Sequence, residues 1–173
     1  MQLKCLVSLF FGFLAIMGCN NSNKFLIEND VLLYDSSRIA ILPFDTSKTW
    51  VPKNSISIKL RQNDIKVIDS LLESAVKNYN STINLSAAYA EVPKDFRQPK
   101  YFLIDVKDYR RQYLAFIDNN NQKFVLVNCF CDQPSPNWKH YMRSVKDGGK
   151  CYFNLIINLT TRNYFDFYVN GAG

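Results

Sequence analysis

Residues 64–79, DIKVIDSLLESAVKNY, decide the fold of this chain. Apolar residues recur there every three or four positions, which is the spacing of one face of a helix with 3.6 residues per turn. The residues on this face are Ile65, Ile68, Leu71, Leu72, Ala75, Val76 and Tyr79. Asn63 is a suitable N-cap, and Asn78 or Asn80 lies near the expected end of the helix. A helix with a single apolar face needs a second layer to cover it, so we expect it to lie on a sheet.

Segments with the composition of β-strands lie on both sides of this helix. Residues 38–44 and 55–60 precede it, and residues 101–107, 113–118, 123–131, 151–159 and 164–170 follow it. The connections 118–122 and 160–163 are short and polar, as in hairpins, so most neighbouring strands should be antiparallel. We therefore predict an α+β fold in which one amphipathic helix packs on a curved antiparallel sheet. This order of elements resembles cystatin-like folds and, less closely, NTF2-like folds.

The start of the chain has the features of a secretory signal. Lys4 is followed by an apolar run, residues 6–17, that is too short for a membrane-spanning helix. The tetrapeptide Ile16-Met17-Gly18-Cys19 resembles a bacterial lipobox, in which the cysteine is acylated and becomes the new N-terminus. We expect a lipoprotein signal peptide over residues 1–18, a polar tether over residues 19–30 and a single α+β domain over residues 31–173. Cys19 is the expected site of lipidation.

A lipid on Cys19 would attach the protein to a membrane of the bacterial cell envelope. An aspartate directly after the cysteine would suggest retention at the inner membrane in some bacteria, and an acidic cluster just downstream would resemble a surface-export signal of Bacteroidota lipoproteins. Residues 20–24, NNSNK, contain neither, so we expect the outer membrane, on its periplasmic side or at the surface. The formal net charge is +6, but the basic residues are scattered and Arg110-Arg111 is their only adjacent pair. This dispersion argues against a nucleic-acid partner.

Three of the five cysteines, Cys129, Cys131 and Cys151, belong to the predicted domain. Antiparallel pairing of the strands on either side of residues 132–150 would place Cys131 opposite Cys151, where a disulfide would close the loop. Cys129 would then be a buried thiol. The alternatives are three buried thiols, or a metal site or thiol catalyst that uses His140. The Cys-x-Cys spacing does not match the usual zinc knuckle, so we expect no metal, no cofactor and no catalytic residue.

Four short segments resemble a pattern found in small uncharacterised Bacteroidota envelope lipoproteins. They are residues 127–131, VNCFC; Trp138; residues 145–153, VKDGGKCYF, which include Asp147-Gly148-Gly149-Lys150-Cys151-Tyr152-Phe153; and residues 167–172, FYVNGA. The resemblance implies a place in the cell envelope. It brings no activity or catalytic residue with it.

Alternation along the last two strands predicts a polar face rich in tyrosine. Its members are Tyr152, Asn154 and Asn158 on one strand and Tyr164, Asp166, Tyr168 and Asn170 on the next. Five of these, Tyr152, Asn154, Tyr164, Asp166 and Tyr168, are the predicted binding residues. Tyrosine rings beside amides and a carboxylate suit a flat recognition surface, because rigid rings lose little entropy and amides adapt their hydrogen bonds. The alternative is an ordinary solvated sheet face, since tyrosine has a high strand propensity.

These observations favour a binding or accessory module without enzymatic activity, whose partner would be a protein or a glycan. One alternative is an inhibitor of envelope or secreted cysteine proteases, which rests only on the cystatin-like order of elements. No Gln-x-Val-x-Gly segment of the kind used by cystatins is present. A hydrolase with an unrecognised acid or thiol site is the least favoured alternative.

Overall fold

The structure, a computed structural model, describes residues 32–45, 51 and 53–171. The predicted signal peptide, Cys19 and the tether lie outside these residues. Among the helices in the described ranges, none is both long enough and apolar enough to cross a membrane.

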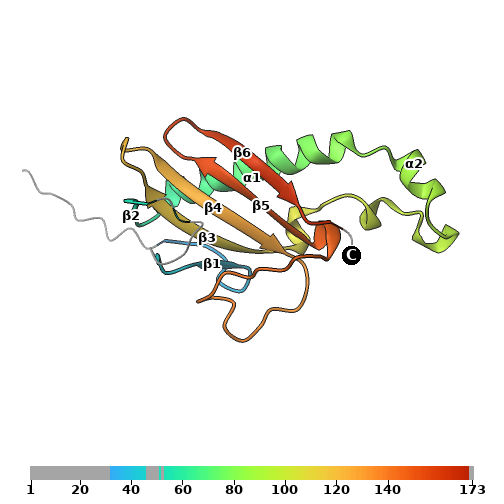
Figure 1. Cartoon of the computed structure of the whole chain (residues 1–173), viewed down its shortest axis with the longest axis horizontal. Coiled ribbons are helices and arrows are strands. Elements are labelled where there is room, and N and C mark those ends of the chain that lie inside the picture. Colours follow the sequence, from blue (N-terminus) through green and yellow to red (C-terminus); the bar gives the residue numbers. More distant parts are fainter. Residues whose placement is uncertain (1–31, 46–50, 52, 172–173) are drawn as a thin grey trace, which may run out of the picture.

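Six strands form one open sheet in the described part of the chain. They are β1 (Ile39–Ile41), β2 (Ile56–Ser57), β3 (Arg110–Ile117), β4 (Lys123–Phe130), β5 (Tyr152–Asn158) and β6 (Asn163–Val169). The order across the sheet is β1-β3-β4-β5-β6, and β2 pairs with the far end of β3. All pairs are antiparallel except β1 with β3. The helix α1 (Gln62–Thr82) lies across one face of the sheet, so the predicted α+β fold is confirmed (Figure 1).

The long helix begins earlier than expected. Arg61, and not Asn63, is the N-cap, and its backbone N–H donates to the Asp64 carboxylate at 2.8 Å. At the other end, the N–H of Ile83 donates to the carbonyl of Asn80. The apolar face follows the predicted period, with Ile65, Ile68, Leu72, Ala75 and Val76 buried against the sheet.

Residues 101–107 do not form the expected strand. Pro99 opens a short 3-10 turn, Pro99–Tyr101, because its fixed φ suits the first position of a helical turn. A second turn, Val106–Asp108, is capped by Asp105, whose side chain accepts from the N–H of Lys107 at 3.0 Å. A short helix that the sequence analysis did not predict, α2 (Leu85–Ala90), lies beyond the end of the sheet (Figure 1).

Both faces of the sheet carry buried apolar side chains. The main core lies between α1 and the sheet and includes the residues expected from alternation along β4 and β5, namely Val125, Val127, Cys129, Phe153, Leu155 and Ile157. A second cluster lies on the opposite face and contains Leu42, Leu114, Phe116, Phe130 and Trp138. The sheet is therefore covered on one side by a helix and on part of the other side by irregular chain.

A β-bulge in β6 interrupts the alternation that the sequence analysis assumed. Ile156 pairs with Phe165 and Asn154 pairs with Tyr168, so the two residues Asp166 and Phe167 stand opposite Leu155 alone. Asp166 has a φ of 53°, in the left-handed region. The predicted common face of Tyr164, Asp166 and Tyr168 is therefore wrong, because the one extra residue in β6 moves the side chains after the bulge to the opposite face from the one that alternation predicts.

The bulge places Tyr164 against the helix. Tyr164 pairs with the buried residue Ile157, packs on the main core, and accepts a hydrogen bond from the Asn78 side chain of α1 at 2.6 Å. Phe165, which alternation assigned to the core, is 40% exposed on the opposite face. Phe167 remains on the helix side, where its ring lies 5.4 Å from the rings of Tyr79 and Phe153.

Substitutions at two phenylalanines test this assignment of faces. Phe153→Ala should lower the free energy of unfolding by about 3–5 kcal/mol, because it opens a cavity in the main core. Phe165→Ala removes the same atoms from the half-open opposite face and should cost about 1 kcal/mol. Urea denaturation followed by circular dichroism measures both losses. Equal losses would contradict the shift of phase at the bulge.

Candidate functional site

Four polar side chains form a row across the outer face, which we define as the face of the sheet turned away from α1. Gln112 on β3 pairs with Asn128 on β4. Asn128 pairs in turn with Asn154 on β5, and Asn154 pairs with Tyr168 on β6. Register partners stand side by side on one face, so these residues form a continuous line that we call the amide row. Gln112 is fully buried whereas Tyr168 is 58% exposed, so the row runs from the covered side to the open side of the sheet.

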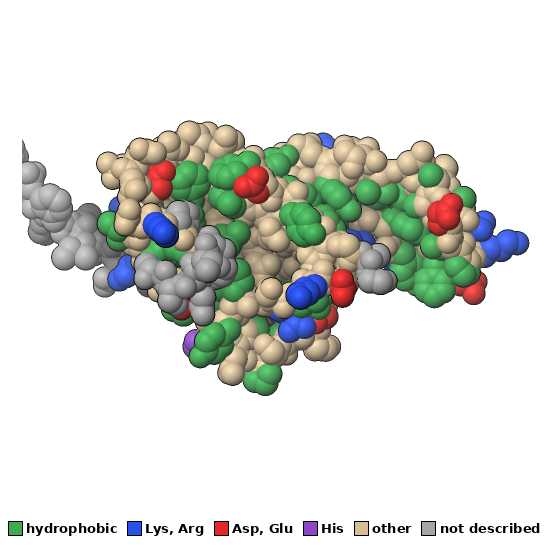
Figure 2. All heavy atoms as spheres, viewed as in Figure 1, with side chains coloured by type: hydrophobic (Ala, Val, Ile, Leu, Met, Phe, Trp, Pro, Cys, Tyr) green, Lys and Arg blue, Asp and Glu red, His purple; other side chains and the backbone are tan. Residues whose placement is uncertain are grey.

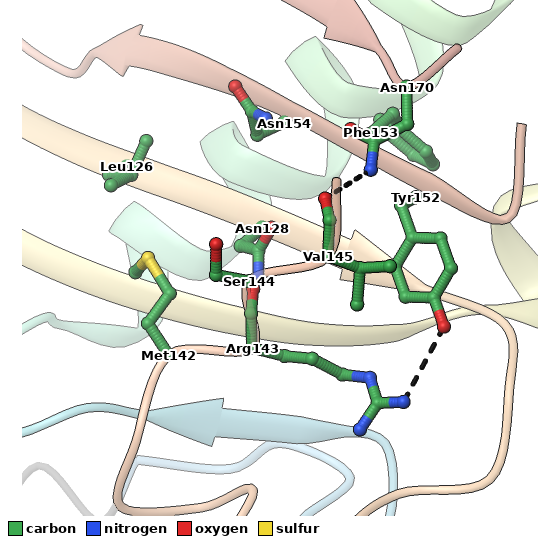
Figure 3. A pocket seen from close by; sticks show the side chains of 10 residues that line it. All are labelled: Leu126, Asn128, Met142, Arg143, Ser144, Val145, Tyr152, Phe153, Asn154 and Asn170. Carbon is green, nitrogen blue, oxygen red and sulfur yellow. Dashed lines mark hydrogen bonds between the residues drawn. The ribbon is translucent and has the colours of Figure 1, made fainter. Parts of the chain in front are cut away.

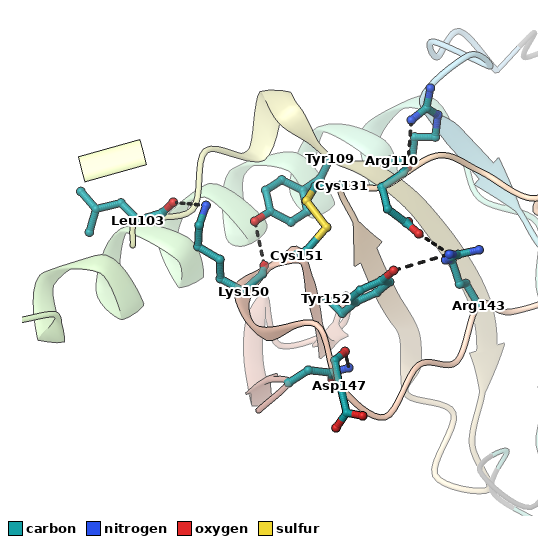
Figure 4. Close-up of a disulfide and its surroundings, with 11 residues drawn as sticks. Leu103, Tyr109, Arg110, Cys131, Arg143, Asp147, Lys150, Cys151 and Tyr152 are labelled. Atoms are coloured by element: carbon teal, nitrogen blue, oxygen red, sulfur yellow. Dashed lines mark hydrogen bonds and ion pairs between the residues drawn. A yellow bond between two sulfur atoms is a disulfide. The ribbon is translucent and has the colours of Figure 1, made fainter. Parts of the chain in front are cut away.

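The loop 132–148 covers part of the outer face and forms one wall of the site. Its ends are joined by the disulfide between Cys131 and Cys151, which confirms the predicted pairing (Figure 4). Beside the disulfide, the N–H of Cys131 donates to the carbonyl of Cys151 at 3.0 Å. The Tyr109 hydroxyl donates to the carbonyl of Lys150 at 2.7 Å. The base of the loop is therefore fixed to both strands that it connects.

The buried amide of Gln112 holds the middle of this loop on the sheet. Its nitrogen donates to the backbone carbonyls of Trp138 and Tyr141. Its oxygen accepts from the backbone N–H of Arg143 and from the Asn128 side chain, each at 2.8 Å. All the hydrogen-bonding positions of the amide are occupied, which removes the cost of burying it.

An apolar anchor supports the same loop. Trp138 is buried, and its ring meets the ring of Phe130 edge to face with 5.8 Å between centroids. Arg143, further along the loop, places its guanidinium over the rings of Phe130 and Tyr152, at 5.5 and 5.8 Å. Burial of an aromatic ring and stacking of a cation both favour the closed position of the loop.

A cavity of about 290 Å³ lies between the loop and the open half of the amide row (Figure 3). The strands contribute Leu126, Asn128, Tyr152, Phe153 and Asn154, and the loop contributes residues 142–145. Asn170, just after β6, completes the wall. Its side-chain nitrogen donates to the carbonyls of Val145 and Asp147, at 2.6 and 3.1 Å.

The one charged side chain among the lining residues, Arg143, is neutralised within the protein. Its guanidinium forms an ion pair with Asp132 and donates to the Tyr152 hydroxyl at 3.5 Å. The hydrogen bond with Tyr152 and the negative charge of Asp132 both raise the pKa of Arg143. Gly148 packs closely against the Tyr152 ring, where a Cβ atom would overlap the ring. Arg143 and Tyr152 therefore form a rigid wall.

Several polar groups of the cavity keep hydrogen-bonding capacity. The side-chain nitrogen of Asn128 donates to Gln112 and to the carbonyl of Arg143, so its oxygen is the group left for a ligand. The same holds for Asn170, whose nitrogen is used twice within the protein. The side chain of Asn154 forms no hydrogen bond with another residue drawn in Figure 3, and Ser144, which lies near Asn128 in the same view, is exposed on the loop.

The structure brings together three of the five predicted binding residues. Tyr152 and Asn154 line the cavity, and Tyr168 is the register partner of Asn154. Tyr164 faces α1, and Asp166 occupies the bulge.

The sequence analysis expected Asn170 on the polar face, and it lines the cavity, but three other residues of the site were missed: Gln112, Asn128 and Arg143. The expected strand 113–118 excluded Gln112, whereas β3 begins at Arg110. Asn128 was not selected because the analysis of this strand considered its buried side, which carries Val127 and Cys129, and not the opposite side. The position of Arg143 depends on how the loop folds back on the sheet, for which the sequence carries no local signal.

Other candidate groups give weaker sites. In the described ranges, no group of three or more His, Cys, Asp or Glu side chains could hold a metal ion. A wider hollow of about 660 Å³ lies between α1 and residues 99–108. The charges that line it, which include Glu73, Lys77, Asp105 and Asp108, are exposed and of both signs. Exposed charges of this kind contribute little to specific binding.

Hydrophobic side chains also reach the surface at the end of the molecule that carries α2 (Figure 2). Phe96 is 51% exposed and Tyr101 is 42% exposed, and their ring centroids lie 5.3 Å apart. This pair is far smaller than the patches that mark protein interfaces. The outer-face cavity is therefore the best-built site.

Gln112 provides a test of the loop wall. Gln112→Leu should leave two carbonyls and one N–H of the loop without a buried partner and should lower the free energy of unfolding by about 2–4 kcal/mol. Amide hydrogen exchange should accelerate at residues 138–145 and stay unchanged in α1. Uniform acceleration throughout the domain would show that Gln112 acts on the whole fold and not on the loop.

The buried thiol provides a second test. Cys129 is completely buried in the main core, and burial raises its pKa. The thiolate therefore forms only after unfolding. The contribution of the buried neutral thiol to stability is present below the pKa of the unfolded thiol, about 8.5, and is lost as the pH rises above it.

Iodoacetamide at pH 9 should label Cys129 slowly in the folded protein and fast in guanidinium chloride. Peptide mapping without reductant should recover the Cys131–Cys151 pair in both cases, and fast labelling of the folded protein would contradict the burial.

Comparison of this chain with protein-family models, with curated proteins and with solved structures finds no match. The likeness to cystatin-like or NTF2-like folds therefore stays an expectation from the order of elements. The chemistry of the site rests on its own geometry.

Proposed function

We propose that the protein is a lipid-anchored binding module of the bacterial cell envelope, without enzymatic activity, and that the outer-face cavity is its recognition site. The lipobox-like sequence that ends at Cys19 supports the anchor. The observation that carries the binding role is the cavity itself, in which Asn128, Asn154 and Asn170 present hydrogen-bonding groups that have no partner within the described part of the chain.

The shape of the cavity favours a ligand-binding site over an ordinary solvated sheet face. An ordinary wet sheet face would be flat, whereas here a disulfide-closed loop rises beside the strands and is held by a buried amide. Preorganised walls reduce the entropy that a ligand has to overcome on binding. Sites of this kind are concave and combine apolar surface with a few fixed polar groups, as here with Leu126 and Met142 beside the amides.

A thiol hydrolase is disfavoured by the position of the remaining cysteine. Cys129 lies on the helix side of the sheet, fully buried, and its raised pKa keeps it protonated. The thiolate is the nucleophilic form, so a residue in this state is inert. His140 is exposed on the loop, outside the main core that contains Cys129.

Two variants of the full-length protein separate the anchor from the recognition site. Cys19→Ser should abolish palmitate labelling and release the protein from membranes into the soluble fraction. The double variant Asn154→Ala, Tyr168→Ala should remain lipidated, folded and membrane-bound, but should lose retention on fractionated cell-envelope material by about tenfold or more, since two contacts of the open side are removed.

Asn63→Ala serves as the matched control, because Asn63 is an exposed amide on α1, behind the sheet. It should bind as the wild type does. Unchanged retention of the double variant would reject the outer face as the recognition site, and membrane attachment of Cys19→Ser would reject the lipid anchor.

A further inference from the structure

We infer that the outer-face cavity takes a neutral sugar unit of an oligosaccharide or polysaccharide. This inference rests on the proposed function, because it names the class of ligand for the same site. It is argued from the charge, the hydrogen-bonding groups, the apolar surface and the shape of the cavity.

The charge of the cavity favours an uncharged ligand. Arg143 is paired with Asp132 and stacked between rings, so it offers no free cation. The Nε atom of Arg143 has no partner in the described part of the chain, but it is buried and cannot be reached by a ligand without a change in the wall. An ionic ligand would lose its hydration without gaining a counter-charge, so the free energy of desolvation would exceed the free energy gained from electrostatic contacts.

The hydrogen-bonding groups suit hydroxyls. Asn128 and Asn170 present carbonyl oxygens, which accept, whereas Asn154 and Ser144 can both donate and accept. A ligand that fills this set has to donate to some positions and accept from others within a short distance. Each hydroxyl of a sugar does both, and vicinal hydroxyls pair well with the two ends of one amide.

The apolar surface has the form that a sugar ring needs. Leu126 and Met142 lie beside the amides, so the polar groups form one side of the cavity and aliphatic carbons form another. A pyranose likewise has a C–H face and a rim of hydroxyls. The exposed ring of Tyr168 stands next to Asn154, on the open side of the amide row, and offers a second surface for stacking.

The size and openness of the cavity indicate one bound unit of a longer chain. A volume of about 290 Å³ lies at the lower limit of small-molecule sites, which hold about 300–1,000 Å³. The loop forms one side of the site, and the exposed Tyr168 stands next to Asn154 at the end of the amide row. A chain can therefore enter along the amide row, with one unit in the cavity and the next on the tyrosine.

The test is a binding screen of the purified full-length protein, solubilised in detergent and kept with its disulfide, against a glycan array. The array holds neutral hexose and N-acetylhexosamine oligomers and acidic oligomers, with uncharged tetrapeptides printed beside them. Neutral oligomers should bind, and acidic ones should bind at least tenfold more weakly. Saturation-transfer NMR and ¹H–¹⁵N spectra of the labelled protein then locate the best oligomer, which should shift the side-chain amides of Asn128 and Asn154.

Variants connect the binding to the inferred contacts. Asn154→Ala and Tyr168→Ala should each weaken the best neutral oligomer by about tenfold, whereas Tyr168→Phe should keep the affinity because the ring remains. Asn63→Ala should have no effect. Thermal melting of each variant verifies that the fold is kept.

The outcomes separate the inference from the proposed function. Binding of acidic oligomers or of peptides alone, with shifts at Asn128 and Asn154, would overturn the neutral sugar and leave the recognition site standing. Binding of neutral oligomers that Asn154→Ala does not weaken would overturn the cavity as their site. If no probe on the array binds, the neutral sugar is rejected, and the retention experiment on envelope material decides the proposed function independently.

Discussion

The buried amide of Gln112 is the interaction on which the outer half of this structure depends. The loop 132–148 has no regular secondary structure over most of its length, so its backbone groups need partners from elsewhere. Gln112 supplies them to Trp138, Tyr141 and Arg143 at once. Without this amide the loop would have to remain hydrated, and the second apolar cluster around Phe130 and Trp138 would lose its cover. The loop that Gln112 holds thus covers part of the outer face of the sheet and forms one wall of the cavity.

One face of the sheet stabilises the fold, and the other face carries the proposed recognition site. The helix face is dry and continuous, from Tyr113 through Val127 to Leu155, and its loss would unfold the domain. The outer face changes from apolar, around Leu114 and Phe116, to polar at Asn154. The sequence tolerates half-buried amides there because the disulfide and the helix-side core already fix the strands. Polar groups that contribute little to folding are free to serve binding, which is why the site lies on this face and not beneath α1.

Sequence reasoning recovered what depends on local periodicity. The helix over residues 64–79, the buried sides of β4 and β5, and the disulfide between Cys131 and Cys151 all follow from alternation within one element or from the pairing of two neighbouring strands. Features that depend on distant pairing were missed. The turns around Pro99 and Asp105 replaced a strand, and Gln112 was placed outside β3. The predicted pairing of Cys131 with Cys151 already places Asn128 opposite Asn154, but no segment of the sequence shows that Gln112 and Tyr168 continue this line on the two neighbouring strands.

The bulge in β6 shows how one irregular residue decides which side chains can bind. With unbroken alternation, Tyr164 would share the outer face with Tyr168, and Phe165 would enter the core. The left-handed backbone of Asp166 instead turns Tyr164 towards Asn78 on α1 and leaves Tyr168 opposite Asn154. Asp is one of the few residues other than glycine that adopt this conformation at low cost. Asp166 therefore acts through the backbone: it sets the register that places an exposed tyrosine at the open end of the amide row, while its carboxylate need not touch a ligand at all.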